Sequence, residues 1–466
     1  MTGKNTVVLV NPRATYFNEI AQKCYPPASL LYLAAALIEA GYSVTVIDAN
    51  AFGLSDDQIS AEIRAARPFL VGFSVYSEIL PQVRLLCRLA RKAAPDARIV
   101  LGGPHATAVP ETTLVQFPEA DFLLSGEAEE SLPLLCGKIL GNSPPADVPG
   151  AYFWNDAGRI TSGPPHRLPD VKGLPRPAKH LLKRAYDEKL YYSILVRKKP
   201  VDTLFSSRGC PFKCGFCYNF RHNYRAREPF DVVNELVKIR ESGIRDVEVC
   251  DDTFTVNEDR ALEIFRLIQK ERLDVSFRIK SRVDVFTERL AAEAKKAGVY
   301  LVAFGMESGS QRMLDIMEKR ITKEQCATAR SLCKIYGMAA HSSWVVGYPG
   351  ETPETVAETT DFIVKLTPTT ANVAVLRPYP QTPAYLIARD EGSLVGEWSP
   401  DAVDFPWVRL PWANEKRVLD DMVKKMMRKI YFRPYYAASF GKDVIYNMNF
   451  LLLRYAFQEA GKVIGF

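Results

Sequence analysis

The stretch RGCPFKCGFCYN, residues 208–219, contains three cysteines in a C-x3-C-x2-C spacing, at Cys210, Cys214 and Cys217. Three thiolates can bind three irons of a [4Fe–4S] cluster, and the fourth iron then has no protein ligand. Because such clusters are normally held by four cysteines, an incomplete set suggests that the open iron binds another molecule. Aromatic and polar residues follow Cys217, as suits a shielded cluster beside a cofactor. The triplet therefore predicts a [4Fe–4S] centre.

Two other interpretations of the triplet stay open. Structural zinc usually takes four ligands in paired spacings, but no second C-x2-C or H-x3-H follows here. The three thiols can also be small apolar core residues that cluster by chance. A disulfide framework is disfavoured, because nine cysteines in 466 residues are sparse and odd in number. The remaining cysteines are expected in the core, although Cys250 beside two aspartates could line a site: Cys24, Cys87, Cys136, Cys250, Cys326 and Cys333.

The bulk composition is that of an ordinary globular protein, with 47% hydrophobic and 24% charged residues. A net charge of +6 is too weak to indicate nucleic acid, so no nucleic-acid partner is expected. No apolar run approaches the roughly 18–20 residues that span a bilayer. The N-terminus leads directly into a strand-like run at residues 7–10 instead of a signal peptide. We therefore expect a cytoplasmic location, in a reducing compartment.

The first third of the chain alternates strand and helix patterns. Apolar runs at residues 7–10, 44–47, 69–73, 98–101 and 122–124 predict strands, and residues 30–40 and 81–94 predict helices. This alternation predicts an α/β fold, a Rossmann-like doubly wound parallel sheet over residues 1–140. Ligands of such sheets bind beyond the carboxyl ends of the strands.

Glycines and polar residues follow three of these strands, and together they predict a binding site at one edge of the sheet. A single Gly-Gly-Pro is more often only a turn, and a single histidine is more often a hydrogen-bonded loop residue. Glycine at a strand end lets the backbone approach a bulky flat ligand or a phosphate. The candidate residues are Ser74, Gly102, Gly103, His105, Thr107, Gly126 and Glu127.

The middle of the chain predicts a second α/β domain. Residues 141–199 are rich in proline and glycine and read as a linker with a small hairpin at residues 151–161. Strands are then expected near residues 203–206, 246–250, 276–280, 300–304, 341–346 and 372–376, with helices such as 229–242 and 259–270 between them. Six such repeats over residues 200–385 predict a partial (β/α)6 barrel, whose active site gathers at the C-terminal strand ends.

The cysteine triplet follows the first barrel strand, and polar residues follow the others. Candidate site residues after the third and fourth strands are Arg282, Glu307 and Ser308. A turn at residues 347–349 follows the fifth strand. Asp284 and Glu351 are expected to be solvated caps.

Residues 386–466 predict a helical C-terminal domain. A helix is expected at residues 414–431, with Val418, Met422, Met426 and Ile430 on one stripe, and a second apolar helix at residues 444–457. The favoured interpretation is a helical cap over the barrel. The alternative is a surface that contacts a membrane or receives a lipid-like substrate, because basic faces beside apolar ones suit an interface.

Together these segments resemble the radical S-adenosylmethionine (SAM) family, in the branch with an N-terminal cobalamin-binding domain, over about residues 5–385. The triplet carries the radical SAM likeness, and residues 25–34, 102–107 and 125–127 resemble the cobalamin domain. Many cobalamin proteins carry Asp-x-His-x-x-Gly after the first strand, where this chain has residues 11–15, NPRAT. The resemblance thus implies a cobalamin whose lower face lacks a histidine ligand.

The resemblance also implies cofactors, an activity and roles for residues. The cofactors are a [4Fe–4S] cluster, SAM and cobalamin, with an external one-electron reductant of the flavodoxin or ferredoxin type. Arg282 would bind the methionine carboxylate, and Glu307 and Ser308 the ribose or amino group. The implied activity is methylation of an unactivated carbon through a 5′-deoxyadenosyl radical, on a small-molecule or lipid-like substrate. Cyclisation, ring contraction or oxygen insertion without methyl transfer is the alternative, and a non-catalytic cobalamin sensor is another class.

Overall fold

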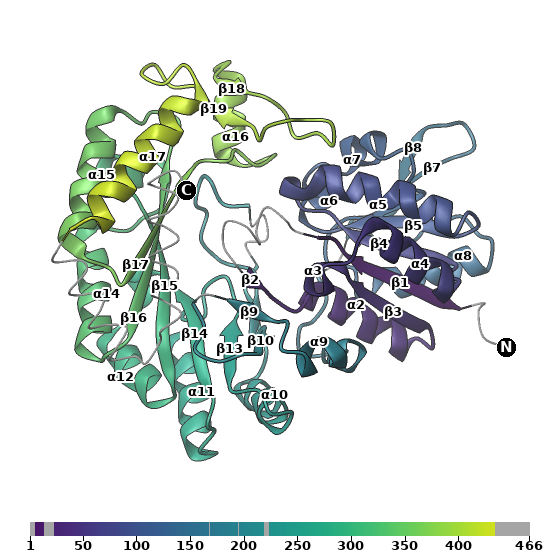
Figure 1. Ribbon diagram of the computed structural model, residues 1–466, viewed down its shortest axis with the longest axis horizontal. Coiled ribbons are helices and arrows are strands. Elements are labelled where there is room, and N and C mark those ends of the chain that lie inside the picture. The colour runs from purple at the N-terminus through teal and green to yellow at the C-terminus, as the bar shows by residue number, and fades with distance from the viewer. Residues whose placement is uncertain (1–4, 14–22, 167, 194, 219–222, 434–466) are drawn as a thin grey trace. The chain divides into compact units, whose positions relative to one another are not determined.

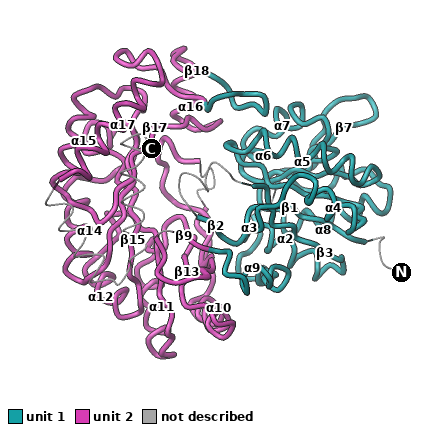
Figure 2. The backbone as a smooth tube through the Cα atoms, in the orientation of Figure 1, with its two compact units in different colours: residues 1–191, 396–405 teal, residues 192–395, 406–466 magenta. Residues whose placement is uncertain are grey.

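The computed structural model describes residues 5–13, 23–166, 168–193, 195–218 and 223–433 (Figure 1). The chain divides into two compact units (Figure 2). Unit 1 comprises residues 1–191 and 396–405, and unit 2 comprises residues 192–395 and 406–466. A short segment near residue 400 therefore returns to unit 1 after the chain has built most of unit 2.

Unit 1 contains a seven-stranded sheet in the order β3-β1-β4-β5-β6-β7-β8. The first five strands are parallel, and the last two are antiparallel: β3 (Ser43–Asp48), β1 (Thr6–Asn11), β4 (Leu70–Ser74), β5 (Arg98–Gly102), β6 (Phe122–Leu124), β7 (Ala151–Trp154) and β8 (Ile160–Ser162). Val7 to Val10 of β1 are at most 1% exposed, as expected for a central strand covered on both faces. The Rossmann-like doubly wound sheet is confirmed.

Helices alternate with the parallel strands of unit 1. They are α2 (Ala28–Glu39), α3 (Ala49–Phe52), α4 (Asp56–Ala66), α5 (Leu80–Ala93), α6 (Pro104–Ala108), α7 (Pro110–Gln116), α8 (Ser131–Leu140) and α9 (Lys183–Asp187). The sequence starts α4 with a capping box, in which Ser55 accepts from Gln58 N and the Gln58 side chain accepts from Ser55 N. The hairpin β7–β8 pairs with β6 and so extends the main sheet.

Unit 2 contains a six-stranded parallel sheet whose strands follow one another in sequence order. They are β10 (Val201–Leu204), β13 (Asp246–Val249), β14 (Ser276–Ser281), β15 (Val299–Glu307), β16 (Ala339–Val346) and β17 (Thr370–Val375). Within the described residues the first and last strands do not pair, so the barrel is open. The partial (β/α)6 barrel is confirmed.

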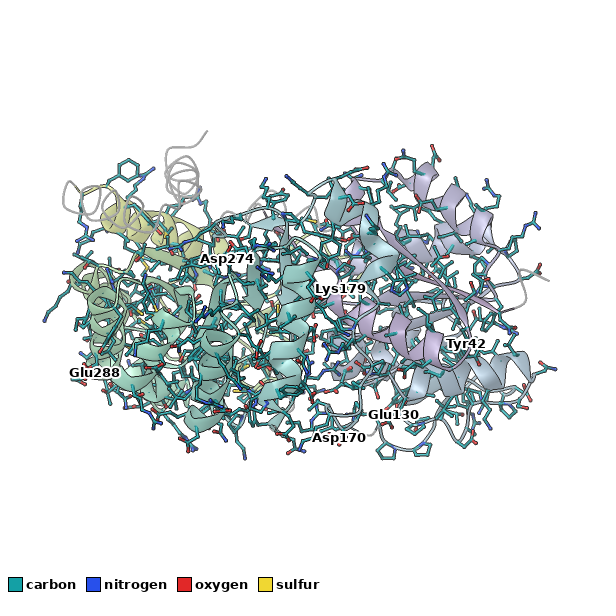
Figure 3. All side chains as sticks on the ribbon, turned by 90° about the horizontal axis from the view of Figure 1, so that it is seen from below. Tyr42, Glu130, Asp170, Lys179, Asp274 and Glu288 are labelled. Atoms are coloured by element: carbon teal, nitrogen blue, oxygen red, sulfur yellow. The ribbon has the colours of Figure 1, made fainter. Side chains whose placement is uncertain are left out.

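Helices cover one face of this sheet (Figure 1). They are α10 (Pro229–Glu241), α11 (Glu258–Lys270), α12 (Glu288–Lys296), α14 (Lys323–Ile335) and α15 (Pro353–Leu366). Asp274, in the loop before β14, and Glu288, the first residue of α12, are exposed (Figure 3). Short elements complete the fold: β2 (Lys23–Cys24), β9 (Tyr192–Ser193), β11 (Ser207–Arg208), β12 (Arg225–Ala226), α13 (Gln311–Ile316), α16 (Pro383–Asp390), β18 (Leu394–Val395) and β19 (Trp407–Val408).

The C-terminal helix α17 (Lys416–Tyr431) packs against α15 and β17. Tyr431 Oη donates to Ala371 O at 2.6 Å and accepts from Ala371 N at 2.8 Å, which fixes the end of the helix on β17. The expected apolar stripe is partly wrong, because Val418 is 38% exposed and Leu419 is the buried residue of that turn. The second apolar helix, expected at residues 444–457, lies outside the described residues. Among the described helices, none has the length and apolar character that crossing a membrane requires.

Candidate functional site at the C-terminal ends of the barrel strands

The cysteine loop follows β10 and lies between β11 and β12, which pair with each other. Cys210, Cys214 and Cys217 are half-buried and form no disulfide bond. Backbone hydrogen bonds hold the loop at Gly215, whose N–H donates to Met317 O and whose carbonyl accepts from Ala384 N, both at 2.8 Å. A Cβ at Gly215 would lie 2.3 Å from Tyr348 Oη, so only glycine fits. Backbone hydrogen bonds to two other segments therefore fix the loop between its second and third cysteines.

Polar side chains from neighbouring strands approach two of the sulfur atoms. Thr253 Oγ1 lies 3.8 Å from Cys210 Sγ, and Arg282 Nη1 lies 3.6 Å from Cys214 Sγ. Burial raises the pKa of the Cys210 thiol, while hydrogen bonds from Phe212 N and Thr253 act in the opposite direction. A donor and a cation beside the sulfurs stabilise the thiolate form, which is the form that binds metal.

The three thiols fit a cluster better than a single ion. Among the described residues, no group of three or more His, Cys, Asp or Glu side chains is close enough to hold one metal ion. In an iron–sulfur cluster each thiolate binds a different iron, so the ligands need not converge on one point. Three half-buried cysteines in one loop, none of them in a disulfide bond, meet that weaker requirement.

A buried carboxylate fixes the entry to the cysteine loop. Asp251 follows β13 and is 1% exposed. It accepts hydrogen bonds from Ser206 N at 2.7 Å and from the hydroxyls of Ser206 and Ser207, each at 2.5 Å. Arg260 Nη2 donates to Ser206 O at 2.6 Å. Asp251 is thus engaged by the protein itself and positions the chain that leads to Cys210.

Arg282 lies directly after β14, and most N–H groups of its guanidinium donate hydrogen bonds within the protein. Its Nε and Nη2 donate to the two carboxylate oxygens of Asp284, each at 2.9 Å, and Nη2 also donates to Lys319 O at 2.8 Å. Its guanidinium carbon lies 3.7 Å from the ring centroid of Phe212, a cation–π contact within the cysteine loop. With Nη1 at Cys214, four of its five N–H groups are used. Asp284 is therefore an ion-pair partner, and the expectation of a solvated cap is wrong.

Glu307 is the last residue of β15, and one of its two carboxylate oxygens accepts no hydrogen bond from the described residues. The residue is 6% exposed and has a left-handed backbone, φ +65°. Its Oε1 accepts from Lys319 Nζ at 3.0 Å, and no other described residue donates to the carboxylate. Ser308 Oγ lies 3.0 Å from Thr359 Oγ1 and accepts from Ser310 N at 3.1 Å, so this hydroxyl is largely used within the protein.

Lys319 is a site residue that the sequence did not reveal. It is 6% exposed, although it lies in the surface-like run Glu318-Lys319-Arg320. Burial opposes its protonation, but the nearby Glu307 and Cys214 outweigh this and raise the pKa of Lys319. Both neighbours have left-handed backbones, φ +51° at Glu318 and +52° at Arg320. No periodicity or motif singled out this lysine, because its burial depends on contacts with β14 and β15.

The turn after β16 buries a carboxylic acid. Glu351 is 2% exposed, and its Oε2 accepts from Gly347 N, so the expectation of a solvated cap is wrong here too. Burial raises the pKa of Glu351 to about 8, and the Gly347 hydrogen bond only partly offsets this. Trp412 Nε1 donates to Glu351 O at 2.8 Å. At pH 7 the Glu351 carboxyl is therefore mostly neutral, and its hydrogen bond with Gly347 N stabilises the Gly347–Glu351 turn.

Replacing Glu351 with glutamine should change how stability depends on pH. The unfolded carboxyl ionises above about pH 4.5, while the folded one keeps its proton to about pH 8. The folded state then binds more protons in this window, so wild-type stability falls as pH rises through it. We expect the Tm of Glu351→Gln, relative to wild type, to rise from about pH 5 to about pH 8.5. A constant difference in thermal scans across this range would show that Glu351 is ionised when folded.

In unit 1 the residues expected at the strand ends lie together. Gly103 has φ +96°, and a Cβ there would lie 2.7 Å from Ser74 Oγ. Thr107 Oγ1 donates to Gly103 O at 2.8 Å and accepts from Gly126 N at 2.9 Å, which ties the ends of β5 and β6 together. Gly102 ends β5, and Glu127 follows Gly126 and is buried. These contacts form one connected group at the carboxyl edge of the sheet.

His105 in this group has a buried nitrogen without a partner. The residue is 1% exposed, and its Nδ1 lies 2.8 Å from Ser77 Oγ. Its Nε2 has no hydrogen-bond partner among the described residues. Burial lowers the pKa of His105 to about 4, so the ring is neutral. A buried nitrogen without a described partner can bind a water molecule, an ion or a polar group of a cofactor at this edge.

Comparison with known proteins identifies both units. Residues 18–135 match the B12 binding domain family, and residues 204–363 match the Radical SAM superfamily. The chain is 29% identical over 455 residues to an uncharacterized methyltransferase of Pyrococcus horikoshii, covering 96% of each chain. It is 30% identical over 365 residues to the anaerobic magnesium-protoporphyrin IX monomethyl ester cyclase of Rubrivivax gelatinosus, covering 76% of this chain and 65% of the relative.

Solved structures share the fold. A radical S-adenosylmethionine methyltransferase from Kitasatospora setae, bound to tryptophan and a SAM analogue, superposes with a TM-score of 0.75 at 20% identity. The match covers 98% of this chain and 100% of that one. At this identity the likeness establishes the arrangement of the chain and leaves the chemistry to the residues of the site.

Proposed function

Because the chain belongs to the radical SAM superfamily, in the branch that carries a B12-binding domain ahead of the radical SAM domain, we propose that it is a cobalamin-dependent radical enzyme that methylates an unactivated carbon. When bound, SAM on a [4Fe–4S] cluster supplies a 5′-deoxyadenosyl radical, and methylcobalamin supplies the methyl group. The protein's part is to bind and orient these groups, because the cofactors carry the difficult chemistry.

The observation that carries the proposal is the group of three half-buried cysteines, none in a disulfide bond, in one hydrogen-bonded loop at the C-terminal edge of the barrel. Cys210, Cys214 and Cys217 would hold the cluster. Arg282 provides positive charge at Cys214, and the unused Oε2 of Glu307 can accept from an amino or hydroxyl group of SAM. Because Arg282 has only one N–H left, its role toward a carboxylate is at most a single hydrogen bond.

The residues at the edge of the unit 1 sheet would hold cobalamin. A Cβ at Gly103 would meet Ser74 Oγ and the backbone of Val75, so glycine lets the ends of β4 and β5 pack closely at this edge. His105 Nε2 can supply the hydrogen bond that it lacks within the described residues. Ser74, Gly102, Thr107, Gly126 and Glu127 complete this surface.

The substrate is a small molecule, and the electron would come from an external reductant of the flavodoxin or ferredoxin type. The membrane contact and lipid-like substrate suggested by the basic C-terminal helix gain no support from the described residues. A second candidate function is cyclisation without methyl transfer, which the 30% identity to a named cyclase favours.

Isotope labelling separates these two functions. Anaerobic cells that express the wild-type chain or an inactive cysteine variant would be fed methionine with a deuterated methyl group. We expect a metabolite, present only with the wild-type chain, whose mass includes the deuterated methyl. A wild-type-dependent product without the label would contradict methyl transfer and support cyclisation. Mass spectrometry detects the labelled metabolite whatever the substrate is.

A further inference from the structure

One face of the unit 2 sheet carries side chains that neither the cysteine loop nor the helices use. On β14 to β17, residues that face the helical layer are buried, such as Ile279, Phe304 and Trp344, each 1% exposed. Toward the C-terminal ends of the strands the alternate residues are half-buried or exposed, whereas Leu301, Ala339 and Thr370, which precede them on the same face, are buried. We call these alternate residues the open face: Lys280, Ala303, Gly305, His341, Ser343 and Asn372. The alternation shows that this side of the sheet is accessible toward the C-terminal ends of β14 to β17.

The strand register places small residues between two polar ones. Lys280 is paired with Ala303, and Ala303 with His341, so these three form one row across the sheet. Gly305, Ser343 and Asn372 form the next row toward the C-terminal ends. Lys280 and His341 are two strand spacings apart, about 9.5 Å, with only a methyl group between them. A ligand group can therefore lie against Ala303 and reach both polar side chains.

Lys280 lacks a charged partner, unlike the other charged groups on this side. Glu248 pairs with Arg278, Arg282 with Asp284, and Lys319 with Glu307. Within the described part of the chain, Lys280 Nζ makes one long hydrogen bond, to Cys250 O at 3.4 Å, and no ion pair. A half-buried ammonium that is not paired is costly unless an anion joins it.

The position of Lys280 relates it to the candidate site. It lies two residues before Arg282, whose Nη1 is 3.6 Å from Cys214 Sγ. Two residues of strand span about 7 Å and return to the same face. A group bound by Lys280 would thus lie one row below the cysteine loop, next to where the radical chemistry is proposed.

We propose that Lys280 binds an anionic group of the substrate, a carboxylate, phosphate or phosphonate, against the open face. The inference rests on the proposed function and narrows its substrate to a small anion-bearing molecule. His341 and Ser343 add polar contacts that suit such a molecule better than a lipid chain. SAM also carries a carboxylate, so the test must separate the cofactor from the substrate as the source of the anion.

Methylphosphonate is a suitable probe because its phosphorus nucleus can be followed by NMR. In the reduced holoenzyme the cluster is paramagnetic, and it broadens the phosphorus line of an anion that binds near the cysteine loop. The oxidised holoenzyme is the diamagnetic reference. We expect broadening with wild type, an about tenfold weaker effect with Lys280→Met, and recovery with Lys280→Arg. Lys296→Met, on the exposed side of α12, should match wild type.

A second measurement identifies the source of the anion. Equilibrium dialysis should give Lys280→Met a SAM affinity within about twofold of wild type. A large loss of SAM affinity with unchanged phosphonate broadening would assign the lysine to SAM and overturn the proposal. Equal broadening in wild type and Lys280→Met would overturn it as well. Failure of the wild-type holoenzyme to cleave SAM would instead contradict the proposed function, so the two failures are distinguishable.

Discussion

Replacement of Cys214 with serine should abolish reductive cleavage of SAM, with a loss on the order of a thousandfold or more. A serine hydroxyl is a far weaker metal ligand than a thiolate, and the cluster would then keep only two of its three protein ligands. Cys214 is the most informative cysteine to replace, because Arg282 Nη1 lies 3.6 Å from its sulfur. The neighbouring Gly215 is hydrogen-bonded to the backbones of Met317 and Ala384. The loop backbone should therefore survive the substitution.

Iron and sulfide content, the electron paramagnetic resonance signal of the reduced protein, and 5′-deoxyadenosine formation are the measurements. Cys333→Ser is the matched control, since this thiol is fully buried in α14, within the helical layer. It should retain iron and SAM cleavage, with at most a modest decrease in Tm. Full iron content and cleavage in Cys214→Ser would contradict the assignment of the cluster to this loop. Zinc without iron in anaerobically purified wild type would support a structural zinc site.

The strands were the most predictable part of the fold, because buried parallel strands are continuous apolar runs. The bounds expected for β6 match the structure, the hairpin expected at residues 151–161 appears as β7 and β8, and the six barrel strands appear in the expected order. The pairing of β7 with β6 was not predictable, because it joins segments separated by α8 and by residues rich in proline. β15 also runs on to Glu307, past a glycine that reads locally as a strand end.

The candidate site was predictable only where spacing or strand position carries the signal. The cysteines and Arg282 come together as their positions suggest. Asp284 and Glu351 were misjudged, because an isolated carboxylate in a loop gives no sign of whether other elements will bury it. On α17, Leu419 and Met427 are buried, while Val418 is exposed, because the docking of that helix on β17 selects its buried face. Lys319 was missed for the same reason.

Replacement of Lys319 with methionine should weaken both folding and SAM binding. Lys319 and Glu307 form a buried ion pair with side chains 7% and 9% exposed. Removal of one partner from such a pair typically costs about 3–5 kcal/mol, because the other charge stays buried alone. The left-handed backbones of Glu307, Glu318 and Arg320 add strain that persists only while their surroundings hold them. Lys319 lies between Glu318 and Arg320 in the chain, and its Nζ donates to Glu307 Oε1.

The double variant Lys319→Met/Glu307→Gln separates the structural effect from the functional one. It removes both charges, so we expect its Tm to recover much of the loss seen in Lys319→Met. SAM affinity should not recover, because the free carboxylate oxygen of Glu307 is gone as well. Lys296→Met is the control, since it breaks an exposed pair with Glu293 and should change stability by less than about 1 kcal/mol. Thermal scans and equilibrium dialysis with SAM give the two readouts. If the double variant is no more stable than Lys319→Met, the lysine does not act through Glu307, and the buried pair is not what fixes this strand end.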